Sequence, residues 1–248
     1  CIRDRVDVGG TTTDVGEVKD GFPRLAGTSV MVADVRTNFA MPDVISIGLG
    51  GGSIISTKEP MAIGPVSVGH ELLQKATVFG GDTLTATDLA VAAGRCKVGS
   101  NPPPSISSFD KLIEILDKMV SDQVARARTS NKNIPVIAVG GGSVMMPSEI
   151  DGLEVITPKH NDLANAVGAA IAQVSGQVSR VVLLNENVDR EGAIKEVTEE
   201  ATSLAVKRHA DPNSISILTQ SDVPLSYLPG NNLLVNVTVV GDLLMEEL

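Results

Sequence analysis

The sequence predicts an α/β fold. Short apolar runs, typical of buried strands, alternate with longer segments whose apolar residues recur at helical spacing. Two of the apolar runs, residues 6–8 and 136–139, lead directly into glycine-rich loops. Hydrophobic residues make up 42% of the 248 residues, so the chain can bury a sizeable core in one large domain or two smaller ones.

Strands and turns dominate the first hundred residues. The Asp20-Gly21 dipeptide is a strong turn signal and predicts a hairpin between residues 15–18 and the segment that starts at Phe22. Ile45 to Ile55 is typical of two strands joined by a glycine loop. The remaining predictions here are a strand at 29–35 and helical segments at 68–78 and 87–93.

Three consecutive prolines, residues 102–104, interrupt the chain, because proline ends helices and stiffens connectors. Ser107 with Asp110 resembles a helix start, and apolar residues follow at helical spacing as far as Val124. The later predictions are strands at 136–139, 181–184, 215–218 and 233–240 and helices at 161–174 and 191–209. We divide the chain into a phosphate-loop and substrate-side segment, an adenosine-side segment and an α/β tail, at 1–98, 99–178 and 179–248.

Composition excludes several classes of function. A net charge of −10 and only 2% aromatic residues argue against nucleic-acid binding. Apolar runs stay well short of the roughly 20 residues of a membrane span. Cys1 and Cys96 are too few for a disulfide framework or a zinc site, which favours a reducing, cytoplasmic setting. The chain begins without Met, so we expect it to be part of a longer protein.

The segment Asp7-Val8-Gly9-Gly10-Thr11-Thr12-Thr13-Asp14 carries the sharpest chemical signal. Gly9 and Gly10 allow main-chain N–H groups to approach an anion, and the hydroxyls of Thr11 and Thr13 can reach phosphate oxygens. Asp7 and Asp14 could hold Mg²⁺, directly or through water. The alternative is a glycine hairpin turn with threonines at strand positions. The motif is neither a Walker loop nor a dinucleotide fingerprint, because the Lys-Ser/Thr pair and the third glycine are missing.

A second glycine loop, Gly140-Gly141-Gly142-Ser143, follows the predicted strand at 136–139. Two such loops far apart in the sequence suggest a cleft that grips one nucleotide from both sides. An ordinary strand-to-helix connection is the alternative for this loop. Asn161 begins a stretch of small residues that would let a helix lie close to a nucleotide or to a sheet, or it is only an N-cap.

The central segment, residues 47–88, is dense in glycines, hydroxyls and carboxylates. Its backbone could shape a phosphate or substrate pocket. Asp88 could orient a nucleophile or the metal, with a helix-capping role as the alternative. Among the three histidines, His70 alone is a candidate for a site, and a packed or surface position is the alternative for it.

These motifs, in this order, resemble the hydantoinase A/5-oxoprolinase family. The resemblance runs from about Arg5 to about Gly176 and rests on the Asp7–Asp14 motif, the loop at 48–54, Gly64-Pro65-x-Ser67-x-Gly69, Thr87-Asp88 and the loop at 140–143. It implies an actin-like (acetate and sugar kinase, Hsp70) ATPase fold with a mixed sheet flanked by helices, incomplete at the N-terminus. Family members use ATP to open cyclic amides such as hydantoins or 5-oxoproline.

The resemblance further implies where ligands bind. ATP and Mg²⁺ are expected near Asp7, Gly9, Gly10, Thr11 and Thr13, with the adenosine side near residues 140–142. We expect Asp7 and Asp88 to act in catalysis, a cyclic amide as substrate, and a second hydantoinase-type subunit or a homo-oligomer as partner. The sequence departs from the family at 70–75, where a helical stretch replaces a Pro-Gly-Pro element, and the family's earlier copy of the first motif is missing.

Two other functions remain open from the sequence. The first is a sugar or acetate-type kinase of the same fold, which would phosphorylate its substrate without opening a ring. The second is a non-catalytic, chaperone-like ATPase that forms a stable complex with a partner. The segment at 64–88 favours the cyclic-amide hydrolase, because generic kinases have no reason to carry it.

Overall fold

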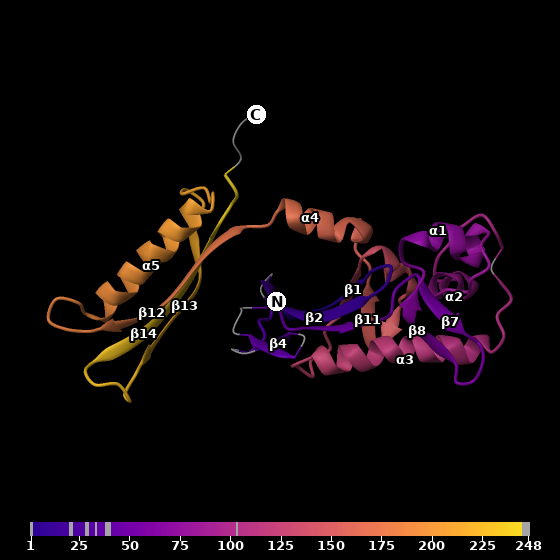
Figure 1. Ribbon diagram of the computed structural model, residues 1–248, viewed down its shortest axis with the longest axis horizontal. Helices are drawn as coiled ribbons and strands as arrows, with labels where there is room; N and C mark the ends of the chain where they lie inside the picture. The colour runs from indigo at the N-terminus through magenta and orange to yellow at the C-terminus, as the bar shows by residue number, and fades with distance from the viewer. Residues whose placement is uncertain are drawn as a thin grey trace. The chain divides into compact units, whose positions relative to one another are not determined.

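The computed structural model describes residues 2–19, 22–27, 30–32, 34–37, 41–102 and 104–244 (Figure 1). The chain forms two compact units, Cys1–Asn165 and Ala166–Leu248. No helix within the described ranges is long and apolar enough to cross a membrane.

A mixed, seven-stranded sheet forms the centre of the first unit, with the order β10-β11-β9-β1-β2-β3 and with β6 also paired to β2. Strands β9 and β11 run parallel to β1, whereas β2, β3 and β6 are joined by antiparallel pairing. The strands are β1 (Ile2–Val8), β2 (Thr13–Lys19), β3 (Phe22–Pro23), β6 (Val44–Ile47), β9 (Val136–Val139), β10 (Glu149–Ile150) and β11 (Leu153–Ile156). The mixed sheet that the resemblance implies is therefore present.

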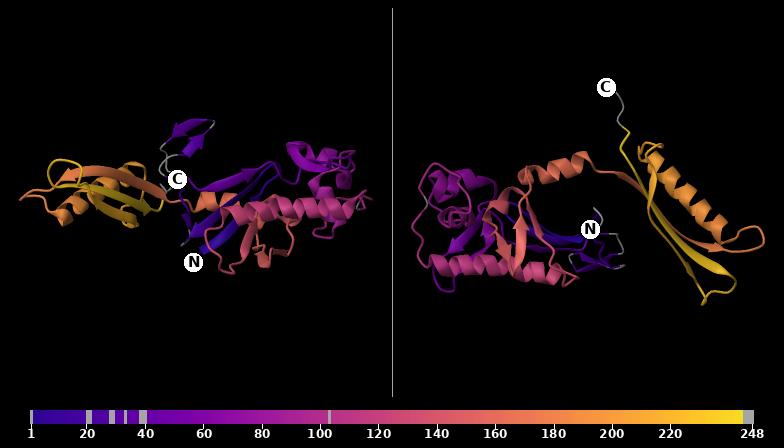
Figure 2. Two further views of the ribbon diagram at one scale, coloured as in Figure 1. Left: turned by 90° about the horizontal axis from the view of Figure 1, so that it is seen from below. Right: turned by 180° about the vertical axis from the view of Figure 1, so that it is seen from behind.

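Helix α3 (Phe109–Ala127) covers one face of this sheet (Figures 1 and 2). Its apolar residues recur every four positions and are buried, and on the sheet the alternate residues of β1 and β2 face them. Each fully buried leucine or valine of this kind contributes roughly 1.5–3 kcal/mol. The shared core includes Leu112, Leu116, Val120 and Val124 from the helix and Val6, Val8 and Val15 from the strands.

Shorter elements complete the first unit. Hairpins are formed by β4 (Val30–Val32) with β5 (Val35–Thr37) and by β7 (Ser53–Ser56) with β8 (Ala62–Ser67). Its helices and helical turns are η1 (Gly69–Glu71), α1 (Leu72–Lys75), η2 (Thr77–Phe79), α2 (Ala86–Ala92), η3 (Gly141–Met145) and η4 (Asn161–Leu163). The boundary between the two units falls within α4 (Ala164–Ala170). Here "η" denotes a 3-10 helix.

The second unit is a three-stranded antiparallel sheet with one helix on its face (Figure 2). Its strands are β12 (Val174–Leu183), β14 (Asn232–Gly241) and β13 (Ser216–Pro224), in that spatial order, and its helix is α5 (Arg190–Lys207). Strand β14 alternates buried and partly exposed residues, and its buried valines pack against the alanines of α5. Small side chains on α5 allow it to lie close to the strands.

Most predicted elements are present, with changes at their ends. The strand expected at 29–35 is instead the β4–β5 hairpin, because the chain turns at Asp34 with φ 63°; Ser29 and Ala33 of that prediction, and the Asp20-Gly21 turn, lie outside the described residues. The helix expected at 68–78 is three short turns, and the helix expected at 161–174 ends at Ala170. Helix α3 begins at Phe109, and Ser108 before it makes no side-chain cap.

The three segments predicted from the sequence do not coincide with the two compact units. Leu89 and Leu112, on either side of the predicted boundary at 98/99, share one core. Val174 and Val178 pack into the core of the second unit, although they precede the boundary at 178/179. The functional labels of the three segments stay predictions.

Candidate functional site

The two glycine loops leave the sheet side by side. Strands β1 and β9 are parallel neighbours, with Asp7 opposite Val139. Their carboxyl ends therefore lie at the same edge of the sheet, and each continues directly into a glycine loop. Ligands in open α/β sheets commonly bind at such an edge.

The second loop lies directly against the first. At Gly140, where φ is +85°, a Cβ atom would lie 2.4 Å from the carbonyl oxygen of Val8 and 2.6 Å from Oδ1 of Asp7. At Gly142 a Cβ atom would lie 2.6 Å from the carbonyl oxygen of Gly9. These three distances leave no room for a side chain, so close approach of the two loops requires glycine at both positions. The structure thus brings together the two loops that the sequence singled out.

A third loop, between β6 and β7, closes on the first from the other direction. The N–H groups of Gly51 and Gly52 donate to the carbonyl oxygens of Gly9 and Gly10, at 3.1 and 2.7 Å. A Cβ atom at Gly50 would lie 2.4 Å from the nitrogen of Thr11. Gly9 and Gly10 are therefore held between two other glycine loops.

This packing fixes which polar groups the first loop offers to a ligand. The carbonyl oxygens of Gly9, Gly10 and Thr12 already accept hydrogen bonds, the last from Gly9 N–H at 2.8 Å. In the described part of the chain, the N–H groups of Gly10, Thr11 and Thr12 have no protein acceptor. All three residues are exposed. A turn that presents successive free N–H groups is suited to an anion such as phosphate.

Asp7 and Asp14 lie beside this loop. They are direct cross-strand partners on β1 and β2, and Asp14 is in turn paired with Ser46 on β6. The Ser46 hydroxyl donates to Asp14 Oδ1, and Arg5 Nη2 lies 3.0 Å from Asp7 Oδ2. These side chains leave the face of β1 and β2 that α3 does not cover, where Arg5, Asp7 and Asp14 line a groove of about 360 Å³.

The carboxylate pair fits a hydrated magnesium ion. Among the described residues there is no group of three or more Asp, Glu, His or Cys side chains that could hold a metal. Mg²⁺ commonly uses only one or two carboxylates and completes its shell with water and substrate phosphates. The two aspartates, beside a loop with free N–H groups, supply that kind of donor set.

Two side-chain hydroxyls of the glycine loops, those of Thr13 and Ser143, are buried. Thr13 is buried and its hydroxyl donates to the carbonyl oxygen of Leu49 at 2.7 Å. Ser143 is 2% exposed, and its hydroxyl accepts from Asn161 Nδ2 at 2.5 Å. Both side chains are turned inward, and their hydroxyls tie loops together. Nucleotide binding by Thr13 and by Ser143, which we expect from the first and the second glycine loop, stays a prediction that these contacts do not favour.

Asp88 is buried in the first turn of α2. Its carboxylate is fully buried and accepts from Thr77 Oγ1 at 2.6 Å and from Val78 N, Thr85 N and Thr85 Oγ1 at 2.7 Å each. Thr85 and Asp88 form the capping box of α2. With four donors and no exposure, Asp88 offers no free position to substrate or metal. The capping alternative describes its contacts, and the expected catalytic role stays a prediction that these contacts do not favour.

Other residues near the loops were missed or left undecided. Asn161 locks the second loop, because its carbonyl oxygen accepts from Gly140 N–H at 2.8 Å while its side chain donates to Ser143. Arg5 could have been found, because strand alternation places residues i and i+2 on one face. His70 is exposed, and Cys96 is partly buried, which raises the pKa of its thiol. Cys1 lies outside the described residues.

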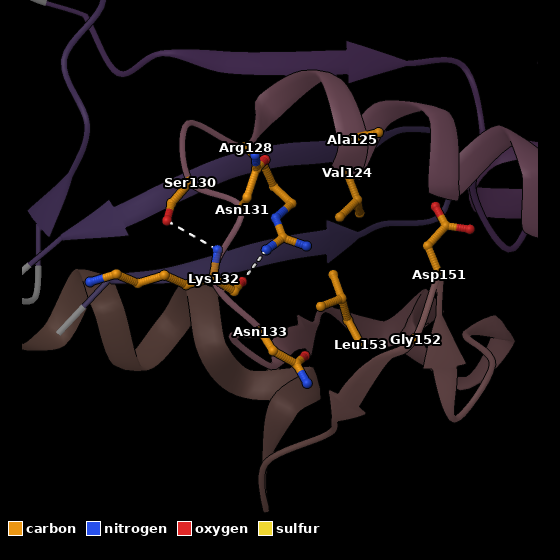
Figure 3. Close-up of a pocket in the computed structure, with 10 residues that line it drawn as sticks. All are labelled: Val124, Ala125, Arg128, Ser130, Asn131, Lys132, Asn133, Asp151, Gly152 and Leu153. Atoms are coloured by element: carbon orange, nitrogen blue, oxygen red, sulfur yellow. Dashed lines mark hydrogen bonds between the residues drawn. The ribbon is translucent and has the colours of Figure 1, made fainter.

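A second hollow, of about 450 Å³, lies between the end of α3 and the β10–β11 turn (Figure 3). Figure 3 shows the Arg128 guanidinium pointing into it, where Nη2 donates to the carbonyl oxygen of Lys132. Nε of the same side chain lies 3.2 Å from Oδ2 of the buried Asp4. None of the residues predicted to bind ligand lines this hollow.

Comparison with known proteins gives both a sequence family and similar folds. The family model described as hydantoinase/oxoprolinase matches residues 5–102. Nothing matches among curated proteins. A nucleotide-free structure of acetone carboxylase, from a study of ATP-dependent acetone carboxylation, aligns with 98% of this chain at 15% identity and a TM-score of 0.66. An ATP-dependent caprolactamase from Pseudomonas jessenii aligns with all of it (100%) at 17% identity and a TM-score of 0.65.

The chain spans 47% of each of these two structures. At such identities the structures establish the fold, a mixed α/β arrangement that this chain shares. The matched segment contains the Asp7–Asp14 motif and the loop at 48–54, which the structure brings into contact. The resemblance that the sequence motifs suggest is therefore supported over residues 5–102, the part of the chain that matches the hydantoinase/oxoprolinase family model.

Proposed function

We propose that this chain is the phosphate-binding part of an ATP-dependent hydrolase that opens a cyclic amide. The observation that carries the proposal is the convergence of three glycine loops on Gly9 and Gly10, beside the Asp7–Asp14 pair. Antiparallel β1–β2 pairing followed by parallel β9 and β11 supports an actin-like ATPase fold for the first unit. Among the structures of similar fold, one is named for the ATP-dependent opening of caprolactam, itself a cyclic amide.

The chemistry follows from the stability of an unstrained amide. When bound, ATP supplies a phosphoryl group that turns the amide oxygen into a leaving group, and Mg²⁺ neutralises phosphate charge. The N–H groups of Gly10, Thr11 and Thr12 would bind phosphate oxygens, and Asp7 with Asp14 would hold the hydrated ion. Water would add to the activated carbon, and cleavage of the C–N bond would open the ring to an amine and an acyl phosphate. A second water would hydrolyse the acyl phosphate to a carboxylate and inorganic phosphate. The protein contributes position and charge stabilisation.

The substrate class and the partner are parts of the same proposal. Acetone, named for the other structure of similar fold, is a ketone, so it shares with a cyclic amide a carbonyl oxygen that can accept phosphate. Since the chain spans 47% of each neighbour, we propose that the rest of the cleft comes from a further segment or a hydantoinase-type subunit. A cytoplasmic setting stays a prediction from the sequence.

Calorimetric titration with Mg²⁺-ATP tests the phosphate-binding part of the proposal. We expect Asp7→Asn to weaken binding about tenfold or more, because a metal ligand is lost. The matched control is Asp122→Asn, an exposed aspartate on α3 that pairs with Lys118. Equal affinity for all three proteins would remove Asp7 from the site.

Phosphate release tests the reaction. Release that depends on added hydantoin, 5-oxoproline or caprolactam, together with ring-opened product, would support the hydrolase. Phosphorylated substrate without ring opening would instead support the kinase. A stable protein complex with no turnover would support the chaperone-like ATPase.

A further inference from the structure

We infer that Arg5 is the internal counter-cation of the Asp7–Asp14 pair and that a divalent cation takes its place. The inference rests on the proposed function, because it requires the two aspartates to bind a metal. Arg5 precedes Asp7 by two residues on β1, so both side chains leave the same face of the sheet. Arg5 Nη2 lies 3.0 Å from Asp7 Oδ2.

The carboxylate pair needs a positive charge. Like charges directly opposite each other on antiparallel strands destabilise the sheet. Ser46, the third member of this cross-strand row, donates a hydrogen bond to Asp14 but is neutral. Within the described ranges, Arg5 is a cation that the structure places against Asp7, and it lines the same groove as the two aspartates.

The ion pair between Arg5 and Asp7 can open easily, so that another cation can replace Arg5. The side chains of Arg5 and Asp7 are 41% and 21% exposed, and ion pairs this accessible to water are weak. Asn165 Oδ1 lies 3.5 Å from Arg5 Nη2, so a second acceptor is already within reach when the guanidinium leaves Asp7. Metal and guanidinium would compete for one carboxylate, and Arg5 would lower the affinity for the metal.

Mn²⁺ alone is a suitable probe, with free ion measured by electron paramagnetic resonance. Arg5→Met keeps an unbranched, largely apolar side chain and removes the charge, and Arg5→Lys keeps the charge. We expect Arg5→Met to bind Mn²⁺ about two- to fivefold more tightly than wild type, and Arg5→Lys to stay close to wild type. Raising the salt concentration should shrink the difference, because exposed charges are screened.

Whether Arg5→Met strengthens or weakens Mn²⁺ binding distinguishes the counter-cation role of Arg5 from a structural role. If Arg5 merely supported the fold, its loss would weaken Mn²⁺ binding. In an Asp7→Asn background, Arg5→Met should no longer change the affinity. Equal or weaker binding by a folded Arg5→Met protein, verified by circular dichroism and urea unfolding, would overturn the inference. If wild type and Asp7→Asn bind Mn²⁺ equally, the proposed metal site itself fails.

Discussion

Gly140 lies so close to Asp7 that a Cβ atom on the glycine would come within 2.6 Å of the aspartate's Oδ1. These residues are 133 positions apart in the sequence, and the parallel pairing of β1 with β9 brings them together. The glycine loop that follows β9 therefore limits the space around the Asp7 carboxylate on β1.

Replacing this glycine should disturb both stability and binding. Gly140→Ala would force a side chain into a left-handed backbone position and against the carbonyl of Val8, so we expect a loss of about 1–3 kcal/mol. Gly141→Ala is the matched control, because nothing lies within 4 Å of a Cβ there. Urea unfolding and Mg²⁺-ATP titration measure the two effects. Similar unfolding midpoints for the two variants would contradict the packing described.

The buried carboxylate of Asp88 should matter for stability. Asp88→Asn replaces one acceptor oxygen with an NH₂ group that faces existing donors, so we expect a loss of about 2–4 kcal/mol in the free energy of unfolding. Asp82→Asn, on an exposed residue of the preceding turn, should change little. Under conditions where the variant is folded, Mg²⁺-ATP affinity should match wild type. Weaker Mg²⁺-ATP binding by Asp88→Asn, with unchanged stability, would instead support the predicted role of Asp88 in the site.

Core packing under the sheet gives a simpler prediction. Leu116 is fully buried against the strands, so Leu116→Ala should cost about 2–5 kcal/mol by removing contacts and leaving a cavity. Lys118→Ala, on the exposed side of the same helix, serves as the control. Thermal and urea unfolding followed by circular dichroism would measure the difference. Equal stability would show that α3 does not pack as described.

Asp4 should make stability depend on pH. Burial raises the pKa of its carboxyl above the ordinary 3.8, a rise that Arg128 opposes and Glu17 reinforces. The folded state then holds its proton at pH values where the unfolded state has lost it. Wild-type stability relative to Asp4→Asn should therefore fall as pH rises from the ordinary value through the raised one. Parallel unfolding free energies of the two proteins across this acid range would contradict the assignment.

The sequence predicted the parts of the site that are local. Periodicity and glycine signals located β1, β9 and the loops that follow them, and the resemblance linked those loops to one site. Gly50 and Gly52 belonged to a predicted loop, but their contact with Gly10 depends on tertiary packing that no local pattern encodes. For the same reason, no local pattern predicts that the Thr13 hydroxyl donates to the carbonyl oxygen of Leu49.

The predicted boundaries of elements were wrong where the backbone conformation differs from what the side-chain pattern indicates. Apolar residues, several of them valines, lie on both sides of Asp34, so one strand was expected, yet a positive φ at Asp34 accompanies a hairpin between β4 and β5. Asp88 shows a different limit. A carboxylate near a family motif suits catalysis or capping equally well in the sequence, and only its burial and four donors distinguish the two.

The hydrogen bonds that Gly51 and Gly52 make to the first loop have a consequence for ligand orientation. With its carbonyls engaged, the loop has a fixed polarity, in which the main chain offers hydrogen-bond donors and the neighbouring strands offer carboxylates. A ligand that combines an anionic and a cationic end, as a metal-bound phosphate does, would then place its phosphate on the loop and its metal on the carboxylates. Binding in this orientation would determine which phosphate oxygen faces solvent before any substrate arrives.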